Sequence, residues 1–165
     1  MPQGKSPSSF TTHGMQVAQS KTKTVRGYFN RIAGRYDVMN TLLSFGLHHL
    51  WKRKAISLAE LRPGAAVLDV CGGTADLALR AASATGPGGR VCVYDFSLAM
   101  MRKGMHKQPG ALPLQWICGD AQALALRTGA FDAVLIGFGL RNLQDVQQGL
   151  REIHRVLKCG GKIIC

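Results

Sequence analysis

The spacing of the hydrophobic residues changes near position 62 of the chain. Before this point, within 25–61, apolar side chains recur every three or four positions, which predicts two amphipathic helices at about 25–49 and 44–61. Beyond it, short and nearly continuous apolar runs alternate with segments of helical period. Apolar runs of this length between turn residues are typical of strands that are buried on both faces.

The alternating part predicts five strands separated by helices. The expected strands lie at 65–70, 90–95, 114–120, 131–139 and 161–165. The expected helices lie at 74–84, 97–107 and 146–158, and Ser97 is expected to cap the second of them. Repeated strand–helix units of this kind predict a doubly wound, mostly parallel, Rossmann-like α/β sheet. The chain stops inside the fifth strand, so we expect an incomplete sheet with an exposed apolar edge there.

The second N-terminal helix is expected to pack its apolar side chains inward. These side chains are Leu47, Leu50, Trp51 and Ile56. The three bases at 52–54 are then expected to face solvent. An Arg-Pro-Gly sequence at 62–64 ends the helix.

The two parts are expected to form one domain after an unstructured start. Residues 1–24 contain no acidic residue and no sustained apolar period, which predicts a disordered basic tail. A targeting segment would share this composition but is usually rich in Arg, which the stretch lacks. Residues 25–165 are expected to form a helical cap at 25–61 and an α/β core at 62–165.

The charge is strongly basic and lies mainly near the N-terminus. The 165 residues include 21 Lys and Arg against 9 Asp and Glu, a formal net charge of +12. Residues 1–54 contain nine of the bases and a single acid, Asp37. Such an excess favours an anionic partner, either a nucleic acid or an acidic membrane surface.

Cysteine usage and hydropathy indicate a reducing compartment. The five cysteines are odd in number and show no Cys-x-x-Cys spacing, which predicts reduced, mostly buried thiols and no metal site. No stretch approaches the roughly 18 apolar residues that a membrane-spanning helix needs. We therefore expect a cytoplasmic protein.

The first strand is followed by a glycine corner, defined as residues 69–76, which read DVCGGTAD. Ligands of open α/β sheets bind at the carboxyl ends of the strands, and Gly72 and Gly73 would let a ligand approach backbone amides there. The glycine spacing does not fit a dinucleotide fingerprint, and no Walker pattern is present. The corner therefore indicates a ligand other than a nucleotide held by its phosphates.

Acidic residues surround the corner and favour S-adenosylmethionine. Asp69 and Asp76 would attract its sulfonium and ammonium charges. Asp95 ends the second strand, where a carboxylate can accept from both ribose hydroxyls, and Asp120 ends the third, where the adenine amino group needs an acceptor. Any one such Asp is more often a turn former, but three successive strand ends with acids favour a binding site.

Longer blocks of the sequence resemble a known family. They are YFNRIAGRYDVMN, LSFGLHHLWKR, VLDVCGGTADLAL, DFSLAM, GDAQALAL, FDAVLIGFGLRN and LREIHRVLKCGGK. Together they resemble the menaquinone and ubiquinone biosynthesis C-methyltransferases, which are class I S-adenosylmethionine-dependent enzymes. The match runs from about residue 25 to the end and covers roughly the first two thirds of a family member, as if truncated at the C-terminus.

The resemblance implies where the cofactor binds. Its contacts would fall on Thr74 in the glycine corner, on Asp95 at the ribose, and on Asp120 with Ala121 at the adenine. Gly72, Gly73 and Asp76 would complete the methionine end. Ala75 replaces a common glycine, and we expect it to favour the helix that follows.

The resemblance also implies C-methylation of a polyprenylated quinol, either a demethylmenaquinol or a benzoquinol. Arg141 would stabilise a phenolate and Asn142 would orient the ring oxygen, while Tyr36 would cover the cofactor. The basic N-terminal helices would contact an anionic membrane peripherally. The alternatives are a non-catalytic cofactor-binding module, a methyltransferase for another small molecule, or an RNA methyltransferase. The last is disfavoured, and no nucleic-acid partner is expected, because GFGLRN lacks the Pro-Pro-aromatic run of base-amine methyltransferases.

Overall fold

Five parallel strands form one sheet in the order β3-β2-β1-β4-β5. The computed structural model describes residues 27, 41–110, 112 and 114–165. The strands are β1 Ala66–Val70, β2 Arg90–Asp95, β3 Leu114–Cys118, β4 Phe131–Leu135 and β5 Leu157–Ile164. The order reverses between β1 and β4, which is where open α/β sheets bind their ligands. The predicted parallel, Rossmann-like sheet is confirmed.

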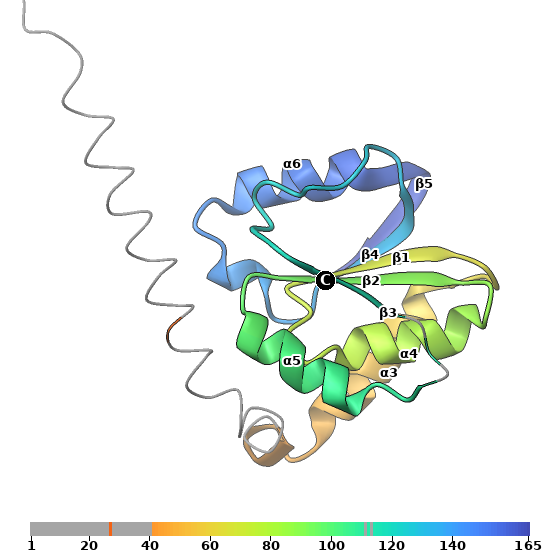
Figure 1. Ribbon diagram of the computed structural model, residues 1–165, viewed down its shortest axis with the longest axis vertical. Coiled ribbons are helices and arrows are strands. Elements are labelled where there is room, and N and C mark those ends of the chain that lie inside the picture. The colour runs from red at the N-terminus through yellow and green to blue at the C-terminus, as the bar shows by residue number, and fades with distance from the viewer. Residues whose placement is uncertain (1–26, 28–40, 111, 113) are drawn as a thin grey trace, which may run out of the picture.

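Helices cover both faces of the sheet. They are α3 Leu47–Ala59, α4 Asp76–Thr85, α5 Leu98–Lys107 and α6 Val146–Val156, with a short 3-10 helix η1 at Leu140–Asn142. Figure 1 shows the sheet nearly edge on, with α3, α4 and α5 on one side and α6 on the other. This two-sided cover explains why the strands read as continuous apolar runs.

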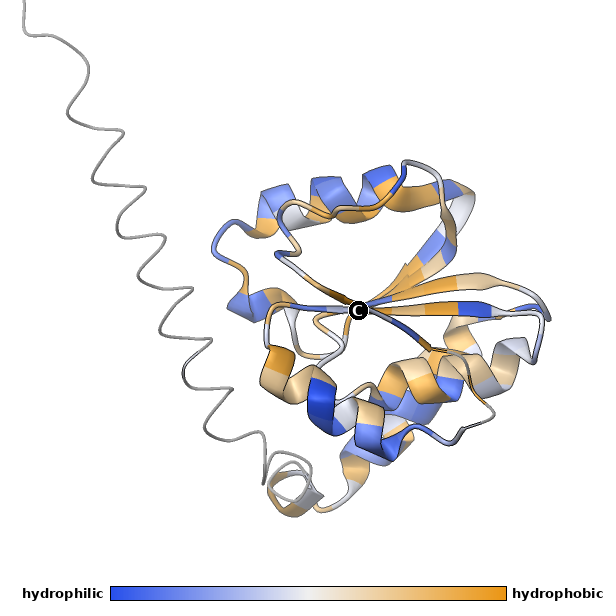
Figure 2. Cartoon of the chain, viewed as in Figure 1, coloured by the Kyte–Doolittle hydropathy of each residue, from blue (hydrophilic) through white to orange (hydrophobic). Residues whose placement is uncertain are grey.

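The strands divide their side chains between two hydrophobic clusters. Val67 of β1 belongs to the cluster under α3 and α4, whereas Leu68 and Val70 belong to the cluster under α6. Successive strand residues point to opposite faces, so Asp69 shares the α4 face with Val67. Figure 2 shows the apolar strands between helices whose outer surfaces are more polar.

The predicted cap of α5 is confirmed, and the start of α4 differs from expectation. Ser97 accepts a hydrogen bond from the Met100 amide at 3.3 Å. Ala75 precedes α4 in the left-handed region, with a φ of 64°, and its side chain is buried. Alanine pays about 1–2 kcal/mol in that region, so the expectation that Ala75 favours the helix is wrong.

Strand boundaries also differ from the predictions: β1 starts one residue later, β3 ends at Cys118 and not at 120, and the largest differences are in β4 and β5. β4 ends at Leu135 and not at 139, because Phe138 adopts a φ of 60° and turns the chain across the edge of the sheet. β5 starts at Leu157 and not at 161, since residues 158–161 form a bulge opposite β4. Within the described residues β5 pairs only with β4, as expected of an edge strand.

The orientation of α3 corrects the sequence analysis. Leu47, Leu50 and Trp51 are exposed, by 47%, 58% and 52%, whereas Ile56 is partly buried against the core. Lys52, predicted to face solvent, has a side chain that is only 13% exposed. Lys52 shares the inward face of α3 with Ala55, Ile56 and Ala59, which pack against the core, and its ammonium group pairs with Asp76 of α4.

The cysteine prediction is correct only in part. All five thiols are free, and Cys92 is buried. Cys118, Cys159 and Cys165 are exposed, because each lies at or beyond a strand end or in the β5 bulge. The disordered tail predicted at 1–24 and most of the helix predicted at 25–49 lie outside the described residues.

Candidate functional site

The glycine corner links the end of β1 to the start of α4. A Cβ added to Gly72 would lie 2.8 Å from Val93 Cγ1 and 3.0 Å from Asp69 Oδ2. Gly73 has a φ of 55°, which a side chain disfavours. The absence of a side chain at Gly72 therefore lets β2 and the Asp69 carboxylate pack closely. Glycine is needed here for internal packing as well as for the approach of a ligand.

Asp95 fixes the corner from the end of β2. Its Oδ2 accepts from the Gly73 amide at 2.9 Å, and its Oδ1 accepts from the Ser97 amide at 2.7 Å. Burial raises the pKa of Asp95, and the amide hydrogen bonds oppose this shift. An ionised carboxylate offers about four acceptor positions, so each oxygen can still accept from a hydroxyl.

Asp69 is the most deeply buried acid of the site. Its Oδ2 accepts from the Ala78 amide in the first turn of α4, at 3.0 Å. Its Oδ1 is buried and has no hydrogen-bond partner among the described residues. Burial raises the pKa of Asp69 to about 7, assisted by the negative charges of Asp95 and Asp76. An unpaired buried acceptor of this kind suits a charged donor group from a ligand.

Asp76 is the first residue of α4 and bridges two lysines. Lys52 Nζ of α3 lies 2.5 Å from one carboxylate oxygen, and Lys107 Nζ of α5 lies 2.7 Å from the other. Burial opposes ionisation, yet the two ammonium groups lower the pKa of Asp76 to about 2. The carboxylate therefore joins three helices at the corner.

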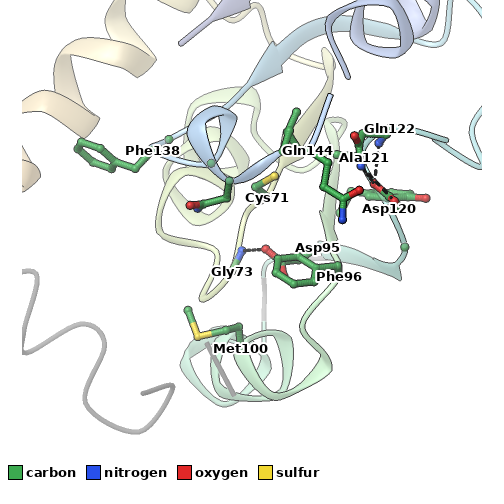
Figure 3. Close-up of a pocket in the computed structure, with 16 residues that line it drawn as sticks. Cys71, Gly73, Asp95, Phe96, Met100, Asp120, Ala121, Gln122, Phe138 and Gln144 are labelled. Atoms are coloured by element: carbon green, nitrogen blue, oxygen red, sulfur yellow. Dashed lines mark hydrogen bonds between the residues drawn. The ribbon is translucent and has the colours of Figure 1, made fainter. Parts of the chain in front are cut away.

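The corner opens into two adjoining pockets. A small one, the corner pocket, is lined by Lys52, Asp69, Gly73, Thr74 and Asp76, among others. The next, the adenosine pocket, continues along the carboxyl ends of β2 and β3. Its lining includes Asp95, Phe96, Met100, Asp120, Ala121, Gln122 and Asn142. Figure 3 shows the Gly73–Asp95 hydrogen bond on its floor, with the ring of Phe138 pointing away.

Asp120 differs from the other acids because it is exposed. Its Oδ1 accepts from the Gln122 amide at 2.9 Å, so it also forms the local turn. Ala121 beside it is buried and lines the adenosine pocket. This geometry leaves Asp120 with acceptor capacity but with more competition from water than Asp95 has.

A third cavity, the apolar pocket, lies on the other side of residues 137–139. Its volume is about 590 Å³, and its walls are mostly aliphatic and aromatic. Lys52 and Arg141 are its two cationic residues. Arg141 is exposed and forms no hydrogen bond or ion pair with the described residues. The adjacent Asn142 lines the adenosine pocket, so the two neighbours of η1 face different cavities.

The structure thus brings together the predicted site residues that it describes. Tyr36 lies outside the described residues. The sequence analysis missed Lys52 and Phe138, which lie between the corner pocket and the apolar pocket. Glycines on both sides of Phe138 were the available signal for its turn, and the signal for Lys52 was the apolar spacing of Ala55, Ile56 and Ala59 at three, four and seven positions beyond it.

Comparison with known proteins gives one family. The ubiE/COQ5 methyltransferase family matches residues 15–165. The chain is 43% identical over 150 residues to a 2-phytyl-1,4-naphtoquinone methyltransferase of a Synechocystis species, covering 89% of the chain and 63% of the relative. It is 42% identical over 151 residues to a demethylmenaquinone methyltransferase of Bacillus cytotoxicus, covering 90% and 64%.

Solved structures agree on the fold. A putative S-adenosyl-L-methionine-dependent methyltransferase from Methanococcus maripaludis superposes with a TM-score of 0.69 at 20% identity, covering 81% of this chain and 61% of that one. The chain spans about three fifths of the length of the curated relatives it matches. A profile match over most of the chain and more than 40% identity to such relatives lead to one conclusion: the chain belongs to the ubiE/COQ5 methyltransferase family.

Proposed function

We propose that this chain is the catalytic core of a C-methyltransferase that methylates a polyprenylated quinol in quinone biosynthesis, with S-adenosylmethionine as donor. The observation that carries the proposal is the pair of adjoining cavities. The donor side, formed by the corner pocket and the adenosine pocket, contains the buried carboxylates of Asp69 and Asp95, and the acceptor side has apolar walls with two cations. The names of the relatives, which act on naphthoquinones and demethylmenaquinone, support this choice of substrate.

The donor side fits S-adenosylmethionine. Asp95 can accept from the ribose diol while keeping its two amide hydrogen bonds, and the unpaired Oδ1 of Asp69 can accept from an ammonium group. Asp120 and Ala121 border the place for the adenine. When bound, the cofactor would supply an electrophilic methyl group. We keep Thr74, Gly72 and Gly73 as contacts of its methionine end, and Tyr36 as a cover.

The acceptor side fits an aromatic ring with a prenyl chain. A quinol ring carbon becomes nucleophilic once its neighbouring hydroxyl has lost a proton. The Arg141 guanidinium, which has no other partner among the described residues, would stabilise the phenolate oxygen and lower the pKa of that hydroxyl. The hydroxyl proton would leave to water at the open side of the pocket. The ring carbon would then take the methyl group as the carbon–sulfur bond breaks and S-adenosylhomocysteine leaves, and the hydrogen on that carbon would move to the ring oxygen and restore the aromatic ring. Asn142 lines the adenosine pocket, so it would orient the ring oxygen of a substrate that reaches the boundary between the apolar pocket and the adenosine pocket.

Replacing Arg141 with alanine tests this assignment. We expect Arg141→Ala to bind S-adenosylhomocysteine as the wild type does, because Arg141 does not line the adenosine pocket. Methyl transfer to a short-chain demethylmenaquinol should fall about 100-fold, the usual loss when one preorganised donor to a developing oxyanion is removed. Calorimetric titration and a radiolabelled methyl-transfer assay measure the two quantities.

The control for this pair of measurements is Arg102→Ala, which removes an exposed arginine from α5. It should change neither quantity. Equal transfer by Arg141→Ala and the wild type would exclude a role for Arg141. Wild-type binding without transfer would support a non-catalytic cofactor-binding module instead.

We also propose peripheral contact with an anionic membrane through the residues just before α3 and the exposed side of that helix. Leu43 and Phe45 are exposed by 78% and 94%. The exposed Trp51 lies 6.1 Å from Phe138 between ring centroids, at the apolar pocket. The exposed bases Arg53 and Lys54 follow in the helix, and each base near such a surface contributes about 1 kcal/mol. Among the described helices, none is long and apolar enough to cross a bilayer.

A double substitution at this surface should weaken vesicle binding. Leu43→Asp with Phe45→Asp should reduce cosedimentation with phosphatidylglycerol vesicles at least about tenfold, because burial of one such side chain contributes about 1.5–3 kcal/mol. Leu150→Asp, on α6 at the opposite face of the sheet, serves as the control and should bind as the wild type does. Unchanged binding of the double variant would refute the contact.

A further inference from the structure

We infer that Lys52 binds the carboxylate of the methionine part of S-adenosylmethionine, and that Asp76 positions Lys52 for this task. The inference deepens the proposed function and rests on it. It assigns a cofactor contact to α3, a helix outside the α/β core.

The position of Lys52 is the first argument. The Lys52 side chain is only 13% exposed, because it lies on the face of α3 that packs Ala55 and Ile56 against the core, and it reaches the glycine corner. It lines the corner pocket together with Asp69 and Gly73, and it also borders the apolar pocket. Its ammonium group therefore lies where the amino acid end of the donor has to fit if the ribose is bound at Asp95.

The local charge is the second argument. Two lysines, Lys52 and Lys107, share the carboxylate of Asp76, and Lys52 Nζ is held at the edge of the corner pocket by this contact. The cluster lies at the start of α4, where the helix dipole is positive and the first amides have no partner within the helix. Lys52, Asp76 and Leu77 all line the corner pocket. This end of the pocket therefore favours an anionic group.

A separate observation shows that the pocket also needs a donor. Asp69 is 1% exposed, lines the same pocket, and has one carboxylate oxygen without a hydrogen-bond partner among the described residues. An ammonium group would satisfy this oxygen. A pocket with an unpaired carboxylate oxygen on one wall and the Lys52 ammonium group on another matches the zwitterionic end of an α-amino acid. This pairing assigns the carboxylate to Lys52 and leaves the ammonium to Asp69.

Two ligands separate this role from a purely structural one. S-adenosylhomocysteine carries the amino acid end, whereas 5′-methylthioadenosine carries the same nucleoside and sulfur without it. We expect Lys52→Met to lower the affinity for S-adenosylhomocysteine about 30-fold, as for the loss of a charge-assisted hydrogen bond. Its affinity for 5′-methylthioadenosine should stay within about twofold of the wild-type value.

Three further proteins complete the calorimetric experiment. Lys54→Met, an exposed lysine of the same helix, should behave as the wild type does with both ligands. Lys52→Arg should recover most of the affinity, because it restores the charge. Asp76→Asn, which loosens Lys52 without removing it, should weaken S-adenosylhomocysteine binding less than Lys52→Met does. Thermal unfolding of each free protein checks that the variants are folded.

The possible failures have different signatures. Equal losses for both ligands in Lys52→Met would show that Lys52 only anchors α3 to α4, and would overturn the inference. Unchanged affinity for S-adenosylhomocysteine would overturn it as well. A wild-type chain that binds neither ligand would overturn the proposed function itself, and the inference with it.

Discussion

Asp95→Ala is expected to lower the affinity for S-adenosylhomocysteine by about 100- to 1,000-fold. Asp95 is buried at the end of β2, where little water competes for its oxygens. Each hydrogen bond from a ribose hydroxyl to such a carboxylate is worth about 1.5–3 kcal/mol, and alanine removes both. The Gly73 and Ser97 amides also lose their acceptor, so the corner itself loosens. Isothermal titration at a temperature below the unfolding transition of the variant measures the effect.

Two other acids calibrate this result. Asp120→Ala should cost less than about tenfold, because Asp120 is exposed and already bonded to Gln122. Asp132→Ala removes an acid that pairs with Lys158 at the opposite end of the sheet, and should leave the affinity unchanged. If Asp95→Ala binds as tightly as the wild type, or if Asp120→Ala loses more, then the ribose is bound elsewhere.

The sheet and its acids could be predicted because both depend on local sequence. A strand buried on two faces has to be apolar along its length, so β1, β2 and β4 are visible as runs. In a parallel sheet all carboxyl ends meet at one edge. An acid directly after such a run therefore lies at the site whatever the order of the strands, as Asp95 and Asp120 do.

Contacts between distant segments could not be predicted in this way. Lys52 meets Asp76 across 24 positions and Lys107 reaches the same carboxylate across 31, and neither partner carries a local signal. The helix packs Ala55, Ile56 and Ala59 against the core together with Lys52, and Trp51 is left 52% exposed. The sequence identifies which residues of a helix are apolar, but it does not identify the distant residue with which a charged side chain forms an ion pair.

Arg141 and Asn142 illustrate a finer limit. Adjacent residues in a strand point to opposite faces by rule, but η1 is a single 3-10 turn whose orientation depends on Phe138 before it. The sequence places both residues after the fourth strand and therefore near the chemistry. Only the structure separates them into an acceptor-side cation and a donor-side amide.

Asp69→Asn is expected to stabilise the free protein at alkaline pH while weakening cofactor binding. Burial raises the pKa of Asp69 in the folded protein to about 7, from an ordinary value of 3.8. A raised pKa of an acid means that the folded state binds the proton more tightly. The resulting stability is fully present below pH 3.8 and is lost as the pH rises to about 7. Asparagine cannot ionise, so the variant escapes this loss.

The size of the effect follows from the interval of pH. Between pH 5 and pH 7 the ionisation of Asp69 lowers the unfolding free energy of the wild type by about 1.4 kcal/mol per pH unit. Above pH 7 Asp69 causes no further decrease. The difference in unfolding free energy should therefore shift by about 3 kcal/mol in favour of Asp69→Asn between pH 5 and pH 8. Any constant cost of burying the amide cancels in this comparison. Urea denaturation at the two pH values measures it.

Binding should change in the opposite direction. At pH 8 the wild type presents an ionised Asp69 Oδ1 to the ligand ammonium, and the asparagine amide offers no charge, so affinity for S-adenosylhomocysteine should fall about 30-fold. Wild-type affinity should also rise as the pH increases through about 7, whereas the affinity of the variant should stay flat. Asp132→Asn is the control, because the pKa of Asp132 is lowered by Lys158 and its carboxylate stays ionised throughout this interval. If the stability difference between the wild type and Asp69→Asn is the same at pH 5 and pH 8, then Asp69 ionises normally in the free protein. Its buried oxygen would then need a partner other than the amino acid end of the donor.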